Sequence, residues 1–166
     1  EHPHLTCPAG REIPRSGGNG AASHAQMYIM GTFLCHGSEE QKKRYLPGIA
    51  DGSLRLQAFG VTEPSSGTDT LALKTTARKA GDSYIINGQK VWTSRAEHSD
   101  LMLLLARTTK REDVENRTDG LSVFLVDMRD ALENGLTIRP IRTMLNHATT
   151  EVYFDELEVP QENLIG

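Results

Sequence analysis

The hydrophobic pattern of this chain changes from a helical to a strand-like period at Leu54, and that change is the strongest constraint on its fold. Beyond Leu54, β-branched residues recur in short segments separated by turn residues, which is typical of strands. The predicted strands cover residues 54–62, 75–79, 83–87, 89–92, 101–107, 121–127, 136–140 and 151–157. Since no helical segments separate them, we expect an antiparallel β-barrel or two packed sheets rather than a doubly wound nucleotide-binding fold.

Two helices are predicted in the first third of the chain. Residues 21–35 carry apolar side chains nearly all round a helix, which indicates burial on more than one side. Ser38, followed by Gln41 three residues later, is a capping-box pattern, so a second helix is expected to begin there. We expect Pro47 to end this helix at Leu46, because the residue before a proline disfavours the helical conformation.

Pairs of turn-forming residues predict the connections between strands. Asn87-Gly88 is the strongest hairpin signal in the chain, since both residues accept the positive φ of a tight primed turn. Gly81-Asp82 is predicted to make the turn before it. The polar residues 108–119 are expected to form a surface loop.

Composition is that of a globular protein and argues against several kinds of partner. The 166 residues suffice for one complete domain and part of a second, divided by the change of pattern into residues 1–53 and 54–166. The net charge of −4 argues against nucleic acid as a partner, because affinity for phosphate backbones needs surplus Lys and Arg. The longest apolar run is residues 101–106, far short of the roughly 20 residues of a membrane-spanning helix.

The cysteines and the first residues bear on the compartment. Cys7 and Cys35 form neither a C-x-x-C motif nor a disulfide framework, which favours a reducing environment. The segment from Glu1 to His4 lacks the basic start and apolar core of a signal peptide, so secretion is not expected. His2 and His4 lack a second pair of ligands, and we predict no metal site.

Residues 56–69, which read L-Q-A-F-G-V-T-E-P-S-S-G-T-D, are the first candidate for a functional site. An apolar strand stops at Pro64 and opens into a loop of small hydroxyl residues and Gly67. Such a loop can bring backbone N–H groups close to an anionic or carbonyl ligand. Glu63 at the mouth of the loop could serve as a base, but we favour a role in hydrogen-bonding the turning backbone.

Other polar and aromatic residues give weaker signals. Ser94 and His98 have a spacing that suggests a nucleophile and a base, but without a G-x-S-x-G elbow or an acid partner we do not expect hydrolysis. His147 is compatible with a functional residue or with a polar turn residue. Trp92, the only tryptophan, is either a core or edge plug or a platform for a flat ring, with hydroxyl donors beside it in Thr93 and Ser94. A nucleotide cofactor would need an unusual site, since neither G-x-G-x-x-G nor G-x-x-x-x-G-K-[ST] occurs.

Four sequence blocks, in this order, resemble the acyl-CoA dehydrogenase family of flavoproteins. They are H-G-S-E-E-Q-K-K-R-Y-L-P from His36, F-G-V-T-E-P-S-S-G-T-D from Phe59, Y-I-I-N-G-Q-K-V-W-T-S from Tyr84 and T-T-E-V-Y-F-D-E-L-E-V-P-Q-E-N-L-I-G from Thr149. The resemblance covers nearly the whole chain. It implies the family's middle β-domain over residues 54–166, preceded by a remnant of its N-terminal α-helical domain over residues 1–53.

The resemblance also implies an FAD site, and two of its segments come from the stretch described above. Phe59, Val61 and Thr62 match the strand that contacts the pyrimidine side of the flavin, where negative charge accumulates on reduction. Gly67 and Thr68 match the loop near the cofactor's pyrophosphate and the bound thioester, which makes Thr68 a substrate-binding candidate as well. The family usually has Ser at this threonine; the hydroxyl survives the exchange, although the β-branch stiffens its rotamer.

The third segment implied by the resemblance is Trp92, Thr93 and Ser94, which matches residues that pack along the flavin. Ser94 stands where the family commonly has Thr near the hydride-accepting nitrogen. Its side chain is freer to rotate than that of threonine, which makes its hydrogen bond less constrained.

In this family a carboxylate base removes the α proton of an acyl-CoA thioester while the β hydride passes to FAD, and an electron-transfer flavoprotein then accepts the electrons. The resemblance places that base in a C-terminal helical domain after Gly166, so we expect no catalytic residue in this chain and an inactive fragment. Glu63 is not assigned the base's role. We expect a homo-oligomeric parent in the cytoplasm of a bacterium or the mitochondrial matrix of a eukaryote. Two alternatives stay open: a flavin monooxygenase or oxidase of the same architecture, and a non-catalytic β-barrel binding module.

Overall fold

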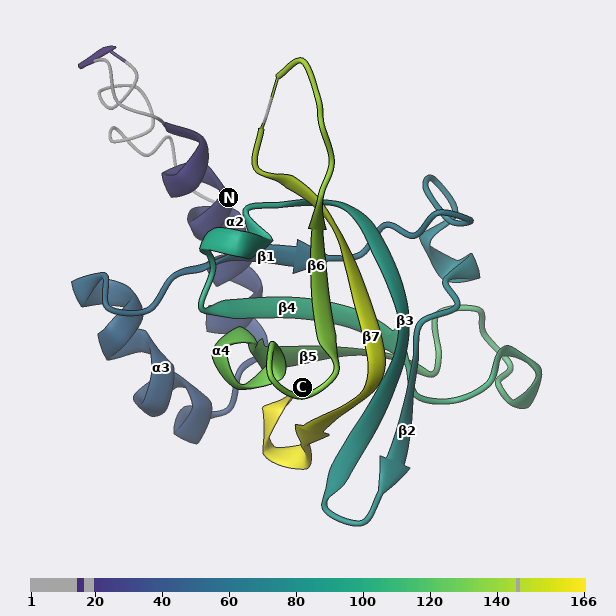
Figure 1. Ribbon diagram of the computed structural model, residues 1–166. Coiled ribbons are helices and arrows are strands. Elements are labelled where there is room, and N and C mark those ends of the chain that lie inside the picture. The colour runs from purple at the N-terminus through teal and green to yellow at the C-terminus, as the bar shows by residue number, and fades with distance from the viewer. Residues whose placement is uncertain (1–14, 17–19, 146) are drawn as a thin grey trace, which may run out of the picture.

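A mixed sheet of eight strands lies at the centre of the described structure (Figure 1). The structure is a computed structural model that describes residues 15–16, 20–145 and 147–166; His2, His4 and Cys7 lie outside these residues. The strands are β1 (Leu56–Gly60), β2 (Thr76–Ala80), β3 (Ser83–Ser94), β4 (Leu101–Arg107), β5 (Leu121–Asp127), β6 (Leu136–Pro140), β7 (Thr149–Pro160) and β8 (Leu164–Ile165). The helices are α2 (Gly20–His36), α3 (Glu39–Asp51) and the single turn α4 (Met128–Ala131), with short 3-10 turns η1 (Thr70–Ala72), η2 (Ala96–His98), η3 (Arg111–Asp113) and η4 (Gln161–Asn163). The predicted fold class, mainly β preceded by helices, is confirmed.

The strands follow the order β6-β7-β3-β2-β4-β5-β8, and β1 also pairs with β4. Most neighbours are antiparallel, as predicted, but β1 and β2 both run parallel to β4, which makes the sheet mixed. Within the described residues, β6 and β8 end this order without pairing to each other, so the sheet is open. Of the two arrangements expected from sequence, packed β layers describe it better than a closed barrel.

The sheet bends so that two groups of its strands face each other. Figure 1 shows β3, β6 and β7 crossing in front of β4 and β5. Apolar side chains between these layers form the larger core, which includes Ile86, Met102, Phe124, Leu136 and Val152. Burial of these side chains is the main driving force for the fold, at about 25 cal/mol per Å² of apolar surface.

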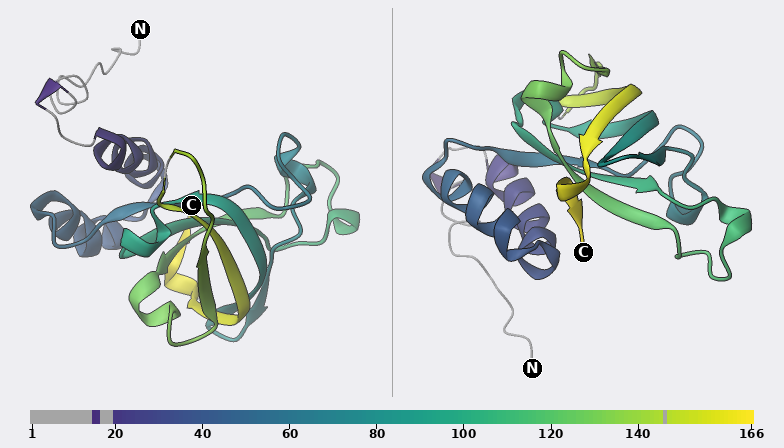
Figure 2. Two further views of the ribbon diagram at one scale, coloured as in Figure 1. Left: turned by 45° about the horizontal axis from the view of Figure 1, so that its top comes forward. Right: turned by 90° about the horizontal axis from the view of Figure 1, so that it is seen from below.

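A second core joins the helices to the outer side of the same sheet. Ile29 and Phe33 of α2 pack with Tyr45 and Ile49 of α3 against Leu103 of β4 and its neighbours. Figure 2 shows both helices on one side of the sheet. The prediction that α2 is buried on more than one side is wrong: Ala25, Ile29 and Phe33, four residues apart, form one buried face, while Met27, Tyr28 and Leu34 are exposed.

The predicted capping box at the start of α3 is confirmed. The backbone N–H of Gln41 donates to Ser38 Oγ at 3.1 Å, and the backbone N–H of Ser38 donates to Gln41 Oε1 at 2.9 Å. The Gln41 side chain also donates to the backbone oxygens of Glu162 and Leu164, at 2.7 and 2.8 Å. The capping residue thus also ties α3 to the end of the sheet.

The prediction that Pro47 ends this helix at Leu46 is wrong. The helix continues to Asp51, with Pro47 inside it, and Gly52 then ends it in a left-handed conformation (φ 83°). Tyr45 and Ile49 lie four residues apart on either side of the proline, and both are buried in the second core. Packing of this stripe offsets the hydrogen bond that proline cannot donate.

The prediction of a hairpin at Asn87-Gly88 is also wrong, since β3 runs through both residues from Ser83 to Ser94. A Cβ at Gly88 (φ 149°) would lie 2.5 Å from Thr75 Oγ1, so the glycine allows another segment to approach closely. Asn87 Oδ1 accepts a hydrogen bond from the backbone N–H of Glu156 at 2.9 Å, where the pairing of β3 with β7 shifts its register. The Asn-Gly pair therefore marks a bulge in a long strand.

The remaining local predictions agree with the structure. Gly81-Asp82 makes the turn between β2 and β3, with Ala80 paired to Ser83 and a φ of 62° at Gly81. Residues 108–119 form a mainly exposed connection that contains η3. Among the described residues, no helix combines the length and the apolar character that crossing a membrane requires.

Candidate functional site

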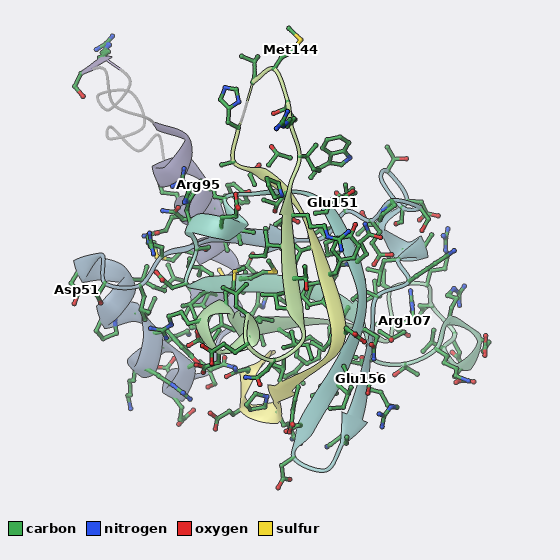
Figure 3. All side chains as sticks on the ribbon, viewed as in Figure 1. Asp51, Arg95, Arg107, Met144, Glu151 and Glu156 are labelled. Atoms are coloured by element: carbon green, nitrogen blue, oxygen red, sulfur yellow. The ribbon has the colours of Figure 1, made fainter. Side chains whose placement is uncertain are left out.

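The structure brings two of the predicted cofactor segments together. The backbone N–H of Val91 on β3 donates to the Thr62 carbonyl at 2.9 Å, just after β1 ends. Arg95, which follows β3, adds a second link because its Nε donates to Gln57 Oε1 of β1 at 2.7 Å. Figure 3 shows Arg95 near the turn that carries η2. Residues 59–62 and 92–94 therefore belong to one region, although they are far apart in sequence.

Phe59 lies on β1 with its ring partly exposed, and its edge faces the Tyr28 ring of α2 at a centroid distance of 6.4 Å. Val61 and Thr62 are half-buried in the connection after β1. The carbonyls of both residues accept hydrogen bonds from β3, from Lys90 Nζ and from the Val91 N–H. The path of the backbone here is thus set by β3.

A bulge in β3 reorients Trp92. The register between β3 and β7 shifts between Lys90 and Thr93, and Trp92 sits in that interval with a φ of 60°. A bulky residue in this conformation is uncommon and costs roughly 1–3 kcal/mol, which other interactions must offset. The indole is 60% exposed, so a large flat apolar surface faces outward. Bulges of this kind are frequent beside functional sites, where they redirect a side chain.

Thr93 combines burial with an unused hydrogen-bonding group. Its carbonyl accepts a hydrogen bond from Thr150 Oγ1 at 2.8 Å, and the residue is only 2% exposed. Thr93 Oγ1 has no hydrogen-bond partner among the described residues. A buried polar atom without a partner costs about 1–3 kcal/mol. Thr75 Oγ1 is the other described side-chain atom in this state, but only Thr93 belongs to a predicted cofactor segment. Ser94, which follows it, is half-buried and pairs with Thr149 in the sheet.

The third predicted segment is the loop that begins after Glu63. Glu63 and Ser66 exchange two backbone hydrogen bonds of 3.1 Å, which set the first turn of the loop. Gly67 and Thr68 follow on the exposed side, and a Cβ at Gly67 would meet no atom within 4 Å. The space beside this glycine is therefore open, as close approach of a ligand to the backbone would require.

Glu63 has the structural role that the sequence favoured. Its carboxylate accepts hydrogen bonds from the backbone N–H groups of Lys74 (2.6 Å) and Thr75 (2.9 Å). It also forms an ion pair of 2.9 Å with Lys90, and both side chains are buried. Burial raises the pKa of Glu63, but the hydrogen bonds from Thr75, Lys74 and Lys90 outweigh it and hold that pKa below its ordinary value. This carboxylate is fully engaged in structure.

Lys90 is the residue of this region that sequence reasoning missed. Its ammonium is fully buried and donates to Val61 O at 3.1 Å and to Glu63 Oε1 at 2.9 Å. Burial lowers the pKa of Lys90, although the Glu63 carboxylate opposes that shift. The available signal was the strand alternation, because Lys90 has the same parity as the buried Ile86. A lysine at an inward position of a strand requires a buried partner.

The two histidine candidates, His98 and His147, are both exposed. His98 is exposed in η2, and His147 is an exposed turn residue in the connection between β6 and β7. Figure 3 shows the tip of that connection, with Met144, extending away from the sheet. In the described part of the chain, no group of three or more His, Cys, Asp and Glu could hold a metal ion.

Comparisons with known proteins agree on one family. The family model for the acyl-CoA dehydrogenase middle domain matches residues 58–157. The acyl-CoA dehydrogenase FadE26 of Mycobacterium tuberculosis is 36% identical over 135 residues, which are 81% of this chain and 33% of that protein. The chain thus spans about a third of the length of this curated relative.

Solved structures give the same result. The Tcur3481-Tcur3483 steroid ACAD matches 95% of this chain and 39% of its own, with a TM-score of 0.83 and 34% identity. The prolyl acyl carrier protein oxidase AnaB matches 88% of this chain and 38% of its own, with a TM-score of 0.79 and 31% identity. With the family model covering residues 58–157 and the fold in agreement, the chain belongs to the acyl-CoA dehydrogenase family.

Proposed function

We propose that this chain is part of an FAD-dependent acyl-CoA dehydrogenase that introduces a double bond between Cα and Cβ of an acyl-CoA thioester. An electron-transfer flavoprotein then takes up the two electrons. Residues 54–166 are the middle β-domain of that enzyme, and residues 1–53 are part of its N-terminal helical domain. The observation that carries the proposal is the unpartnered, buried Thr93 hydroxyl beside the exposed Trp92, where β1 and β3 meet.

The residues of this region fit a flavin. A flavin offers a flat apolar face and one edge rich in hydrogen-bonding groups. Trp92 presents an exposed flat ring, and Thr93 Oγ1 is a donor that lacks a partner within the described residues. The open space beside Gly67 leaves room for a ligand close to the backbone. Phe59, Val61, Thr62, Gly67, Thr68, Trp92, Thr93 and Ser94 are the residues we propose to hold FAD.

When bound, FAD accepts the hydride that leaves the β carbon. The side chains of the proposed site would bind the cofactor, stabilise its developing charge and exclude water from it. The Thr62 and Thr93 hydroxyls would be donors at the flavin edge where negative charge develops, and a donor oriented in advance stabilises that charge. Trp92 would cover the ring and keep water away from it, and Ser94 lies next to Thr93 at the end of β3. Thr68 would contact the thioester end of the substrate.

We assign no catalytic base within this chain. Glu63 is buried, bonded to two backbone N–H groups and paired with Lys90, so it is not free to accept a substrate proton. The base belongs to the part of the enzyme that the family resemblance places after residue 166. We therefore propose that residues 1–166 alone are inactive, that the parent is a homo-oligomer, and that it works in the bacterial cytoplasm or the mitochondrial matrix.

A second function has one specific observation in its favour. The structurally similar AnaB, at 31% identity, is a prolyl acyl carrier protein oxidase. An oxidase of the same architecture would hold its flavin with the same residues and pass the electrons to oxygen. Such an oxidase would differ from a dehydrogenase in how readily oxygen reaches the reduced flavin.

The two functions separate in one experiment on the full-length parent protein. We expect the purified protein to be yellow, and its flavin absorbance to bleach when a saturated acyl-CoA is added without oxygen. Slow reoxidation in air would support the dehydrogenase, whereas fast reoxidation with release of peroxide would show the oxidase. A colourless protein that takes up no FAD on reconstitution would contradict both, and would leave the non-catalytic binding module.

A further inference from the structure

The buried ion pair of Glu63 and Lys90 lies beside the three proposed FAD segments, which are residues 59–62 at the end of β1, the loop 64–73, and residues 92–94 at the end of β3. It bonds to Val61 in the first segment and to the backbone N–H groups of Lys74 and Thr75 at the base of the loop. Lys90 itself belongs to β3, two residues before the third segment. The two charged groups are 2.9 Å apart, and their side chains are 3% and 0% exposed. No other ion pair between described residues has both of its side chains buried to this degree.

Lys90 connects the first segment to the third. Its ammonium donates to the Val61 carbonyl at 3.1 Å, while its backbone precedes the bulge at Trp92 by two residues. The neighbouring Val91 N–H donates to the Thr62 carbonyl at 2.9 Å. Consecutive residues of β3 thus hold two consecutive carbonyls of the β1 segment, one through a side chain and one through the backbone.

Glu63 connects these strands to the second segment. Its two carboxylate oxygens accept the N–H groups of Lys74 and Thr75, eleven and twelve residues further along the chain. These hydrogen bonds close the base of the loop that carries Gly67 and Thr68. Because Lys90 bonds to Oε1 of the same carboxylate, the loop is fixed relative to β3.

Stability alone is a weak reason for such a pair. The desolvation of two buried charges offsets most of their attraction, and apolar residues of similar volume often give equal or greater stability. A bridging pair does, however, impose one arrangement on the groups that it bonds. Here those groups are the Val61 carbonyl and the backbone at the base of the loop 64–73, and Lys90 joins both to β3.

We propose that Glu63 and Lys90 are positioning residues that hold the three FAD segments in register. The inference rests on the proposed function for the identity of the ligand. In this role Glu63 does not contact the substrate. Lys90 likewise helps to position the segments of the site. A displacement of about 1 Å at a cofactor or substrate contact can reduce activity on the order of 100-fold, so the pair matters beyond its own energy.

The test uses the full-length parent protein and the double variant E63Q/K90M. Lys90→Met alone would leave a buried carboxylate without a cation, which is strongly destabilising. The double variant removes both charges, keeps similar side-chain volumes and is expected to fold, yet it lacks the link between the segments. Val159→Ala is the matched control, because Val159 is buried and pairs with Tyr84 at the opposite end of β3.

Hydrogen exchange of the flavin-free protein is the first measurement. We expect exchange of the hydrogen-bonded amides of Ser66, Lys74, Thr75 and Val91 to be at least about tenfold faster in E63Q/K90M than in wild type, relative to the amides of β4. Val159→Ala should change these amides only as much as it changes global unfolding. Wild-type exchange rates in E63Q/K90M would overturn the inference.

The FAD dissociation constant after reconstitution is the second measurement. We expect an increase on the order of 10- to 100-fold in E63Q/K90M, with no comparable change in Val159→Ala. An unchanged constant despite faster exchange would overturn the inference, since the pair would then support the fold but not the site. A wild-type parent that binds no FAD would overturn the proposed function instead, and the exchange rates alone would then decide whether the pair holds the segments.

Discussion

Strands β3 and β4 belong to the same sheet but differ in almost every other respect. β4 has seven residues and pairs in regular register with β5. All but one of its residues are buried. β3 has twelve residues and two register shifts against β7. It also contains a buried lysine and an exposed tryptophan with a positive φ. The regular strand supports the core, and the irregular strand carries the proposed site.

The contrast shows that the features that lower local stability lie in β3 and not in β4. The side chains of β4 alternate between the two cores, with Met102 and Leu104 on one side and Leu101 and Leu103 on the other. In β3 the Trp92 conformation, the Lys90 desolvation and the unpartnered Thr93 hydroxyl each cost free energy. Departures of this kind tend to gather where a protein binds a ligand.

The largest effect is expected in β4. Leu103→Ala removes a fully buried side chain between the sheet and the helices, and should lower the free energy of unfolding of the parent by about 2–5 kcal/mol. Denaturant titration measures this, with Leu132→Ala as the control because Leu132 is 53% exposed. Equal effects of the two variants would show that β4 is not the structural centre of the sheet.

The acid side of the stability profile should depend on Glu63. A carboxyl whose pKa is lower in the folded state stabilises the fold above its ordinary value of 4.5, and that contribution is lost as the pH falls through the folded-state pKa. Each unit of lowering corresponds to about 1.4 kcal/mol.

The corresponding measurement is the free energy of unfolding from about pH 6 down to about pH 3, for wild type and E63Q/K90M. We expect the wild-type value to fall more steeply than that of E63Q/K90M below pH 4.5, the ordinary pKa of the carboxyl. Parallel profiles would contradict the assigned role of the ion pair.

Thr93→Val should act in opposite directions on stability and on binding. It replaces a buried hydroxyl that lacks a described partner by a methyl group of similar size, so the flavin-free parent should gain about 1 kcal/mol. The FAD dissociation constant should rise roughly tenfold, because a hydrogen bond to the ligand is lost. Calorimetry and fluorescence titration measure the two quantities. Loss of stability with unchanged binding would mean that Thr93 serves the fold only.

The smallest effect on stability is expected for Ser94→Ala. Ser94 is half-buried at the end of β3, and its replacement should change the free energy of unfolding by less than about 0.5 kcal/mol. Anaerobic stopped-flow measurements should nevertheless show slower flavin reduction by acyl-CoA, since a hydroxyl that acts mainly in the transition state affects rate more than binding. An unchanged rate would remove Ser94 from the proposed site.

The regular parts of the fold could be predicted from sequence. The bounds of β4, β5 and β6 agree with the predicted ranges 101–107, 121–127 and 136–140, because alternation and turn residues act locally. The errors at Pro47 and at Asn87-Gly88 have a common cause. In both places a contact distant in sequence overrides a local preference: burial of Tyr45 and Ile49 in one, and close approach of Thr75 in the other.

The site was predicted only in part. The family resemblance named the three segments, but their convergence depends on the Val91 to Thr62 hydrogen bond and on Lys90, which connect residues about thirty positions apart. The strained conformation of Trp92 and the unpartnered hydroxyl of Thr93 likewise follow from a register shift that no local pattern encodes. The family resemblance suggests the residues of the proposed site, and the sheet determines how their segments meet.

A structure of the full-length parent with bound FAD would test the central claim most directly. We predict that the flavin ring lies against Trp92 and that one of its polar atoms is within hydrogen-bonding distance of Thr93 Oγ1. A flavin bound elsewhere, or one that leaves Thr93 Oγ1 without a partner, would contradict the account.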